Sequence, residues 1–209
     1  METSVFNRAE YWDKVFSTKN LQDQSWFEAE PSSLEIFEKF KIPPDASIID
    51  VGCGDSLLID VLLASGYAHI TALDVSAKAL EKAQLRLGHK AVAIHWIAAD
   101  VTTFEPPEKY DVWHDRAAFH FLTNQHDIQL YISVLRKSIK PGSLVILSTF
   151  AQEAPDKCSG LAVNKYDEDI LVKMLGAGFE KLECNTFFHQ TPFNKRQAFL
   201  VCCFRPPEK

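Results

Sequence analysis

The stretch that most constrains this chain is "SIIDVGCGDSLLIDVLLASG", which runs from Ser47 to Gly66. Its first half is mostly apolar and β-branched, as in a buried strand, and its second half repeats leucine at helical spacing. Two glycines, Gly52 and Gly54, stand between the two patterns. A glycine has no Cβ, so the backbone at such a turn can approach a ligand closely. The stretch therefore predicts a strand at 47–51, a tight turn and a helix, with a ligand site at the turn.

Short β-rich runs continue to alternate with helical runs after this stretch. Further strands are predicted at 69–74, 91–100, 110–115 and 141–150, and helices at 56–65, after Ser76 and at 128–139. Lys140, Pro141 and Gly142 predict a turn before the last of these strands. This alternation is typical of an α/β domain with a mainly parallel sheet.

The two ends of the chain follow a different pattern. Helices are predicted at 8–16 and 32–40, joined by a loop or lid, and a third helix at 167–175. Two β runs then follow at 179–188 and 197–204. Only a short polar loop joins them, so they must pair as an antiparallel hairpin. A standard dinucleotide-binding domain does not usually end in this way.

The composition is that of an ordinary globular enzyme. The chain has 209 residues, of which 46% are hydrophobic and 24% charged, and its net charge is −6. One domain is expected at this length. The negative charge argues against a nucleic-acid partner, which a protein binds by neutralising phosphates. No apolar run approaches the roughly 18 residues of a membrane span, so no membrane partner is expected.

Cysteine usage predicts neither a disulfide framework nor a metal site. The five cysteines are Cys53, Cys158, Cys184, Cys202 and Cys203. Their number is odd, and no C-x-x-C pair occurs among them. We therefore expect reduced thiols and a cytoplasmic location.

Three aspartates stand where consecutive strands are predicted to end. They are Asp50, Asp74 and Asp100. Ligands of open α/β sheets bind beyond the carboxyl ends of the strands, and Asp74 follows Gly54 by about 20 residues, the spacing of an acid that binds ribose hydroxyls. The third glycine of G-x-G-x-x-G is replaced by Leu57. Carboxylates beside a helix start disfavour a pyrophosphate, so the pattern favours a nucleoside with a cationic tail.

The chain resembles the class I S-adenosylmethionine-dependent methyltransferases over nearly its full length. "IIDVGCGDS", "ALDVS" and "AADVTTF" are similar to that family's first three motifs. The resemblance implies a three-layer Rossmann-like fold with a seven-stranded mixed sheet, strand order 3-2-1-4-5-7-6 and an antiparallel last strand. It implies S-adenosylmethionine as cofactor and S-adenosylhomocysteine as product. A single domain, 1–209, is expected to comprise N-terminal helices and lid (1–46), a cofactor-binding half (47–150), and a substrate loop with the terminal hairpin (151–209).

The resemblance also implies roles for individual residues. Gly52 and Gly54 would contact the methionine and ribose portions, Asp74 the ribose hydroxyls, and Asp100 the adenine amino group. "YWDKVF" and "SWFEAEP" resemble a branch that includes protein-lysine methyltransferases, in which aromatic residues close over the cofactor. The alternative for those aromatics is that they anchor the packing of the N-terminal helices. The implied cofactor residues are Tyr11, Trp12, Trp26, Asp50, Gly52, Gly54, Asp74, Val75, Asp100 and Val101.

The stretch "YDVWHDRAAFHFL" lies where the family's fourth motif begins and supplies the catalytic candidates. It lacks the Asn-Pro-Pro-Tyr pattern of enzymes that methylate amide or adenine nitrogens. Asp115 and His120 are candidate general bases, and Arg116 either binds an acidic acceptor or pairs with Asp115. His120 stands between apolar residues, so a satisfied core histidine is favoured slightly over a base. Three later residues are further pocket candidates: Cys158, His189 and Gln197.

The resemblance implies transfer of a methyl group by in-line displacement, and we expect a small-molecule acceptor. A protein lysine is the alternative acceptor, supported by the resemblance of the N-terminal segments. An alternative of another class is a dehydrogenase-like domain that binds NAD, or a non-catalytic nucleotide-binding domain. The absent third glycine and the terminal hairpin count against it.

Overall fold

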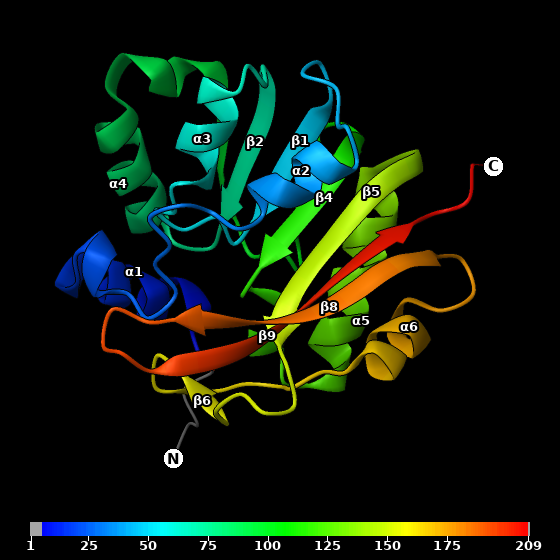
Figure 1. The fold of residues 1–209 in the computed structure, drawn as a ribbon. Helices are drawn as coiled ribbons and strands as arrows, with labels where there is room; N and C mark the ends of the chain where they lie inside the picture. The colour runs from blue at the N-terminus through cyan, green and yellow to red at the C-terminus, as the bar shows by residue number, and fades with distance from the viewer. Residues whose placement is uncertain (1–5, 209) are drawn as a thin grey trace.

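A seven-stranded sheet forms the centre of the computed structural model, which describes residues 6–208 (Figure 1). Its strands are β1 (Ser47–Val51), β2 (His69–Asp74), β3 (Ile94–Ala98), β4 (Tyr110–Arg116), β5 (Ile139–Phe150), β8 (Glu180–Gln190) and β9 (Arg196–Arg205). Their order is β3-β2-β1-β4-β5-β9-β8. Strand β9 runs antiparallel to both of its neighbours, whereas the pairs from β3 to β5 are parallel. The predicted fold class, strand order and antiparallel last strand are confirmed.

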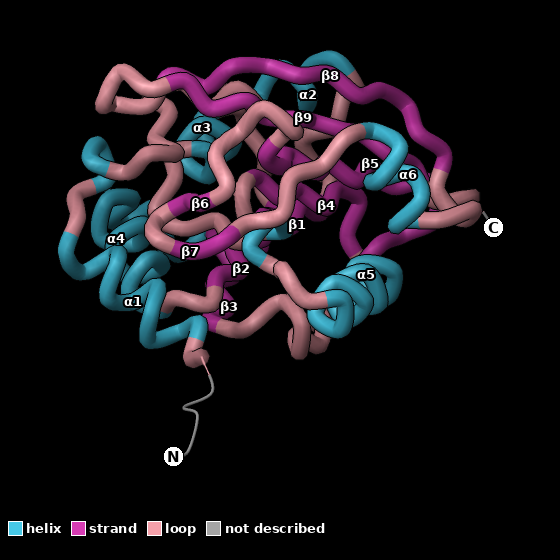
Figure 2. Tube along the Cα trace, turned by 90° about the horizontal axis from the view of Figure 1, so that it is seen from below, coloured by secondary structure: helices cyan, strands magenta, loops and turns pink. Residues whose placement is uncertain are grey.

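Helices cover both faces of this sheet. They are α1 (Arg8–Thr18), α2 (Leu34–Lys39), α3 (Leu58–Ala64), α4 (Ala77–Leu87), α5 (Gln125–Ser138) and α6 (Glu168–Leu175). Helices α2, α3 and α4 share one buried cluster with the sheet, and α5 and α6 share another on the opposite face (Figure 1). Three short 3-10 helices occur at Leu21–Asp23, Gly88–Ala93 and Phe119–Phe121. Helix α1 lies with the hairpin of β6 (Lys157–Cys158) and β7 (Leu161–Ala162) at one end of the sheet (Figure 2).

The first strand, turn and helix form as their sequence predicts. All five residues of β1 are buried, as expected for a central strand covered on both faces. The amide of Gly52 donates to the carbonyl of Leu73 at 2.8 Å, which ties the turn to the end of β2. Helix α3 ends before Gly66, whose φ of +89° is the left-handed conformation common after a helix.

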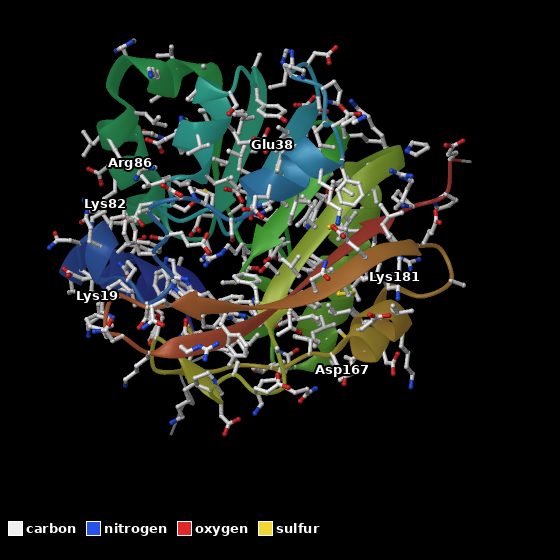
Figure 3. All side chains as sticks on the ribbon, viewed as in Figure 1. Lys19, Glu38, Lys82, Arg86, Asp167 and Lys181 are labelled. Atoms are coloured by element: carbon white, nitrogen blue, oxygen red, sulfur yellow. A yellow bond between two sulfur atoms is a disulfide. The ribbon has the colours of Figure 1, made fainter. Side chains whose placement is uncertain are left out.

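Helix α1 is held against α4 by polar contacts at the start of α4. Ser76 caps α4 by accepting from the amide of Ala79 at 3.1 Å, and its hydroxyl donates to Asp13 of α1 at 2.6 Å. Further along the two helices, Lys82 donates to the carbonyl of Lys19 at 2.6 Å (Figure 3). These contacts fix α1 across the end of the sheet where the strands finish.

The predicted starts of β3 and β5 differ from the structure. Residues Gly88–Ala93 form a 3-10 helix, so β3 begins at Ile94, three residues later than predicted. The turn predicted at Lys140–Gly142 lies within β5, which begins at Ile139. A proline is tolerated there because β9 pairs with β5 only from Val145 onward, so the start of β5 is an edge.

The expectation of five reduced thiols is wrong for two of them. Cys184 and Cys202 face each other across β8 and β9, with Cα atoms 4.1 Å apart, and their sulfurs are bonded. The pairing follows from the hairpin register, which cysteine counting does not reveal. Cys53, Cys158 and Cys203 are free and buried.

Residues 6–208 hold no group of three or more His, Cys, Asp or Glu side chains placed to bind a metal ion. In the same part of the chain, no helix has the length and apolar character to cross a membrane.

Candidate active site

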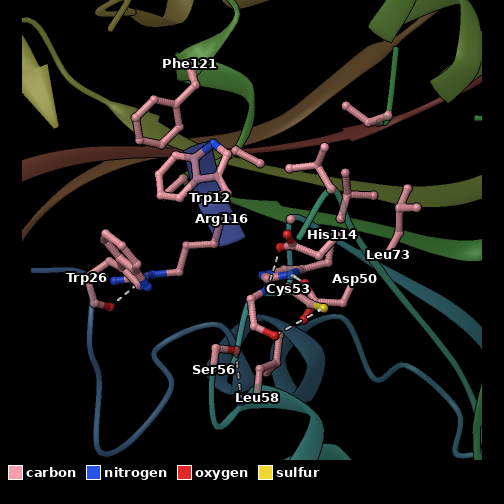
Figure 4. A pocket seen from close by; sticks show the side chains of 18 of the residues that line it. Trp12, Trp26, Asp50, Cys53, Ser56, Leu58, Leu73, His114, Arg116 and Phe121 are labelled. Atoms are coloured by element: carbon pink, nitrogen blue, oxygen red, sulfur yellow. Dashed lines mark hydrogen bonds and ion pairs between the residues drawn. The ribbon is translucent and has the colours of Figure 1, made fainter. Parts of the chain in front are cut away.

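A cavity opens where β1, β2, β3 and β4 end, and α1 and the segment that follows it form its other wall (Figure 4). All the implied cofactor residues except Tyr11 line it: Trp12, Trp26, Asp50, Gly52, Gly54, Asp74, Val75, Asp100 and Val101. The hydroxyl of Tyr11 instead donates to the carbonyl of Ser159. The sheet thus brings residues from distant parts of the sequence to one site.

The glycine turn at the floor of the cavity depends on missing side chains. Gly52 and Gly54 have φ of +65° and +56°, which residues with a Cβ rarely adopt. A Cβ at Gly52 would lie 2.4 Å from the Cβ of Ala118, so this glycine is required by the protein's own packing. A Cβ at Gly54 would lie 3.1 Å from the ring of Phe16. The two glycines therefore allow the backbone to follow this turn, and their missing side chains leave room for Ala118 and Phe16.

Asp74 joins the end of β2 to the glycine turn. One of its carboxylate oxygens accepts from the amide of Gly54 and the other from the amide of Ser76, each at 2.8 Å. Burial raises the pKa of Asp74 to about 6, although both hydrogen bonds oppose the shift. A carboxylate oxygen can accept a second hydrogen bond, and Asp74 lines the cavity.

Asp100, at the end of β3, is paired with the N-terminal helix. Arg8 of α1 donates to one of its oxygens at 2.8 Å and also binds Asp127. The other oxygen accepts from the amide and hydroxyl of Thr102 at 2.8 and 2.7 Å. Burial alone would raise the pKa of Asp100, but the bonds from Arg8 and Thr102 outweigh it and hold that pKa below its ordinary value. Asp100 is therefore a fixed, ionised acceptor.

Aromatic rings line the α1 side of the cavity. Arg8, Trp12 and Phe16 recur at intervals of four residues, so they form one face of α1. The ring of Trp12 packs edge-on against Phe121 at 4.9 Å and against Trp26 at 5.9 Å between centroids (Figure 4). These rings are both packing anchors and cavity wall, so the two alternatives considered for Trp12 and Trp26 are compatible.

Arg116 lies in the cavity wall but does not pair with Asp115. Its Nη1 donates to the carbonyl of Trp26 at 3.0 Å (Figure 4). Its Nη2 lies 2.8 Å from Glu28. Its guanidinium also lies 5.1 Å from the ring centre of Phe199. Burial lowers the pKa of Arg116, and the charge of Glu28 opposes that shift. The ion pair ties β4 to the segment that follows α1.

Asp115 does not line the cavity, which removes the geometric basis for its role as a base. It is fully buried on the opposite face of β4, where it accepts from the hydroxyl of Tyr131 at 2.7 Å. It also accepts from the amides of Ala118 and Phe119 at 3.0 and 3.2 Å. Burial raises its pKa to about 6. Its position is that of a structural carboxylate that shapes the turn after β4.

His120 is buried and also lies outside the cavity. Its Nδ1 accepts from the amide of Phe150 at 3.2 Å, and its ring packs on Phe121 and Phe150. Burial, with a contribution from the charge of Arg116, lowers its pKa to about 3. A neutral histidine packed among aromatic rings matches the alternative of a core histidine.

The three later candidates lie in three different places. Cys158 lines the cavity, and burial raises the pKa of its thiol, which keeps it protonated. His189 lies in a neighbouring shallow pocket, 2.8 Å from the carbonyl of Ser25. Gln197 is buried outside both pockets.

Sequence reasoning missed a hydrogen-bonded group at the base of the cavity. Nδ1 of His114 lies 2.7 Å from a carboxylate oxygen of Asp50, and Nε2 lies 2.8 Å from the hydroxyl of Ser33. All three residues line the cavity. Strand alternation could have found His114, because it lies two residues from Arg116 and therefore on the same face of β4.

Comparisons with known proteins agree with this geometry. Residues 48–142 match the model of a family described as a methyltransferase domain. An uncharacterized methyltransferase of Mycobacterium tuberculosis is 35% identical over 104 residues, which are 49% of this chain and 50% of that protein. The matched region is thus about half the length of this curated relative.

Two solved structures share the fold along almost the whole chain. One, reported for the conversion of a disulfide bond into a thioacetal group during echinomycin biosynthesis, has a TM-score of 0.75 at 18% identity and covers 96% of this chain and 94% of its own. The other is the N-methyltransferase NodS of Bradyrhizobium japonicum in complex with S-adenosylhomocysteine. It has a TM-score of 0.66 at 18% identity and covers 97% of this chain and 100% of its own. At such identities the likeness concerns the fold.

Proposed function

We propose that this chain, whose residues 48–142 match a methyltransferase domain family, is a class I S-adenosylmethionine-dependent methyltransferase that transfers a methyl group to a small molecule. One observation carries this proposal: the carboxylates at the ends of β1, β2 and β3 line the same cavity as the two-glycine turn. When bound, S-adenosylmethionine supplies an electrophilic methyl group on a positively charged sulfur.

The residues present fit that cofactor. One oxygen of Asp50 is buried in the cavity wall and has no hydrogen-bond partner among the described residues, so it is free to accept from an ammonium group. Trp12, Trp26 and Phe121 present aromatic rings, whose faces attract a cation such as a sulfonium. A pyrophosphate would instead meet the carboxylates of Asp50 and Asp74 at this turn.

Each strand end has a proposed role in holding the cofactor. Asp50 accepts from the amino group, Asp74 from the ribose hydroxyls, and Asp100 from the adenine amino group, with a backbone contact from Val101. Arg8 supports the last of these roles because it keeps Asp100 ionised and oriented. The protein contributes mainly alignment and exclusion of water, since the sulfonium is a good leaving group.

A small-molecule acceptor is favoured by the walls of the cavity. The face of α1, the segment around Trp26 and Glu28, and Cys158 of β6 border it on the side away from the sheet. Protein side chains therefore surround the space beside Arg116. A lysine on a protein, the alternative acceptor, needs an open path to the same space.

Two measurements test the proposal. Calorimetric titration is expected to show binding of S-adenosylhomocysteine and no comparable binding of NAD. The purified protein is then incubated with S-adenosylmethionine labelled in its methyl group and with a cell extract divided into protein and protein-free fractions. We expect label in the protein-free fraction. Label in the protein fraction would favour the lysine alternative, and absence of S-adenosylhomocysteine binding would overturn the assignment of the cavity.

A further inference from the structure

We propose that His114 is the general base of this site and that it receives the acceptor's proton through the hydroxyl of Ser33. The inference rests on the methyl-transfer function proposed above and narrows its substrate class. The acceptor carries a hydrogen on the atom that is methylated, as a hydroxyl, a thiol or an amine does.

Three separate elements build this group. Asp50 lies near the end of β1, and His114 is its direct partner in register on β4, so both side chains leave the sheet on the same face. Ser33 immediately precedes α2. Their exposed fractions are 2%, 1% and 3%, respectively, so bulk water does not compete for their hydrogen bonds.

The partners of the two ring nitrogens fix the direction of proton transfer. A carboxylate only accepts, so Nδ1 of His114, 2.7 Å from Asp50, carries a hydrogen. In the neutral ring, Nε2 is then an acceptor, and the hydroxyl of Ser33 donates to it at 2.8 Å. Ser33 lines the cavity, so its oxygen is available to accept a hydrogen bond from the acceptor molecule. Asp50, His114 and Ser33 thus form a path from the cavity to a buried carboxylate.

The proposed step is balanced within the site. The acceptor atom's lone pair forms the bond to the methyl carbon, and the electron pair of the breaking carbon–sulfur bond returns to sulfur. The acceptor's proton passes to the oxygen of Ser33 while the proton of Ser33 passes to Nε2 of His114. The positive charge lost from the sulfonium reappears on the imidazolium, beside the carboxylate of Asp50.

The elements packed around His114 contribute both charged and uncharged neighbours. Asp50 of β1 and Arg116, two residues further along β4, are charged neighbours on the cavity side, with Asp74 further across the sheet on β2. The α2 side contributes Ser33 and the ring of Phe37, whose centre is 6.3 Å from that of His114. The thiol of Cys53 in the glycine turn is kept protonated by burial, which raises its pKa.

Nitrogen NMR of histidine-labelled protein tests the inference without any turnover. In the complex with S-adenosylhomocysteine near neutral pH, we expect the His114 resonances to show a protonated Nδ1 and an unprotonated Nε2. The spectrum of His114→Asn identifies these resonances by their loss. An Nε2–H tautomer, or a ring protonated on both nitrogens, would overturn the proposal.

Label transfer to the protein-free extract supplies the second readout. The asparagine amide retains a donor for Asp50, so His114→Asn is expected to bind S-adenosylhomocysteine within about threefold of wild type. Its rate should fall about 100-fold or more, as expected on removal of a general base. Ser33→Ala should lose less, about tenfold, since water can replace a hydroxyl.

His95→Asn, an exposed histidine on β3, is the matched control and should behave like wild type. If His114→Asn keeps the wild-type rate, the base is elsewhere and methyl transfer itself still stands. If the wild type transfers no label, the proposed function fails, and the NMR result still decides the state of His114.

Discussion

Gly52→Ala adds one methyl group at the most constrained point of the glycine turn. Gly52 has φ of +65°, and the added Cβ would lie 2.4 Å from the Cβ of Ala118. Both carbons are close to backbone, so neither can rotate away. The left-handed backbone costs an L-residue about 1–2 kcal/mol, and forcing extra volume into a packed site costs about 1–3 kcal/mol. We therefore expect the free energy of unfolding to fall by about 2–5 kcal/mol.

A second substitution separates the two contributions. In Gly52→Ala combined with Ala118→Gly, the clash is removed and the left-handed backbone is retained. The double variant should recover about 1–3 kcal/mol relative to the sum of the single variants, measured by urea unfolding as a double-mutant cycle. Gly178→Ala is the matched control, because a Cβ there meets no atom within 4 Å.

Two results would refute this reasoning. A loss below about 1 kcal/mol in Gly52→Ala would mean that the turn relaxes freely. If the changes in the free energy of unfolding of the two single variants simply add in the double variant, Ala118 is not the obstacle. S-adenosylhomocysteine binding by the folded fraction of Gly52→Ala is measured alongside, so that loss of the turn is distinguished from loss of the fold.

Three further predictions concern carboxylates. The pKa of Asp115 is about 6 in the folded state, above that of an unfolded aspartate, so its contribution to stability is lost as the pH rises towards 6. From about pH 4 to 7, urea unfolding should show Asp115→Asn gaining about 3 kcal/mol relative to wild type, and an unchanged difference would contradict this. Asp74, also with a pKa of about 6, should make S-adenosylhomocysteine affinity fall about tenfold per pH unit below that value; calorimetry of Asp74→Asn should show no such dependence. Arg8→Gln should raise the pKa of Asp100, followed by carboxyl NMR, and a resonance that titrates as in wild type would rule out Arg8 as its cause.

The fold could be predicted because its signals are local and repeated. Ser47–Val51 is predicted as β1 with the bounds that the structure has, since a strand buried on both faces has a continuous apolar pattern. The short polar loop before Arg196 predicts the hairpin. The start of β5 was harder to predict, because Pro141 is typical of a turn. Only the structure shows that β9 does not pair with this part of β5, so a proline is tolerated there. The bond between Cys184 and Cys202 depends in the same way on register.

The site could be predicted only in part. The carboxylates at the strand ends follow from topology, because parallel strands bring their carboxyl ends to one edge. Asp115, the candidate base on β4, does not line the cavity whereas His114 does: the two are adjacent in sequence, but alternation points them to opposite faces. No sequence spacing indicates that Ser33 or Glu28 lies in the same cavity, since both come from the segment between α1 and β1.

The face of α1 that carries Arg8, Trp12 and Phe16 is itself a wall of the cavity. Docking of this helix and occupation of the cavity are therefore thermodynamically linked: each makes the other more favourable by the same free energy. Proteolytic cleavage around Lys19 would report on this linkage directly. A ligand that binds in the cavity should slow this cleavage, and a ligand with higher affinity should slow it more.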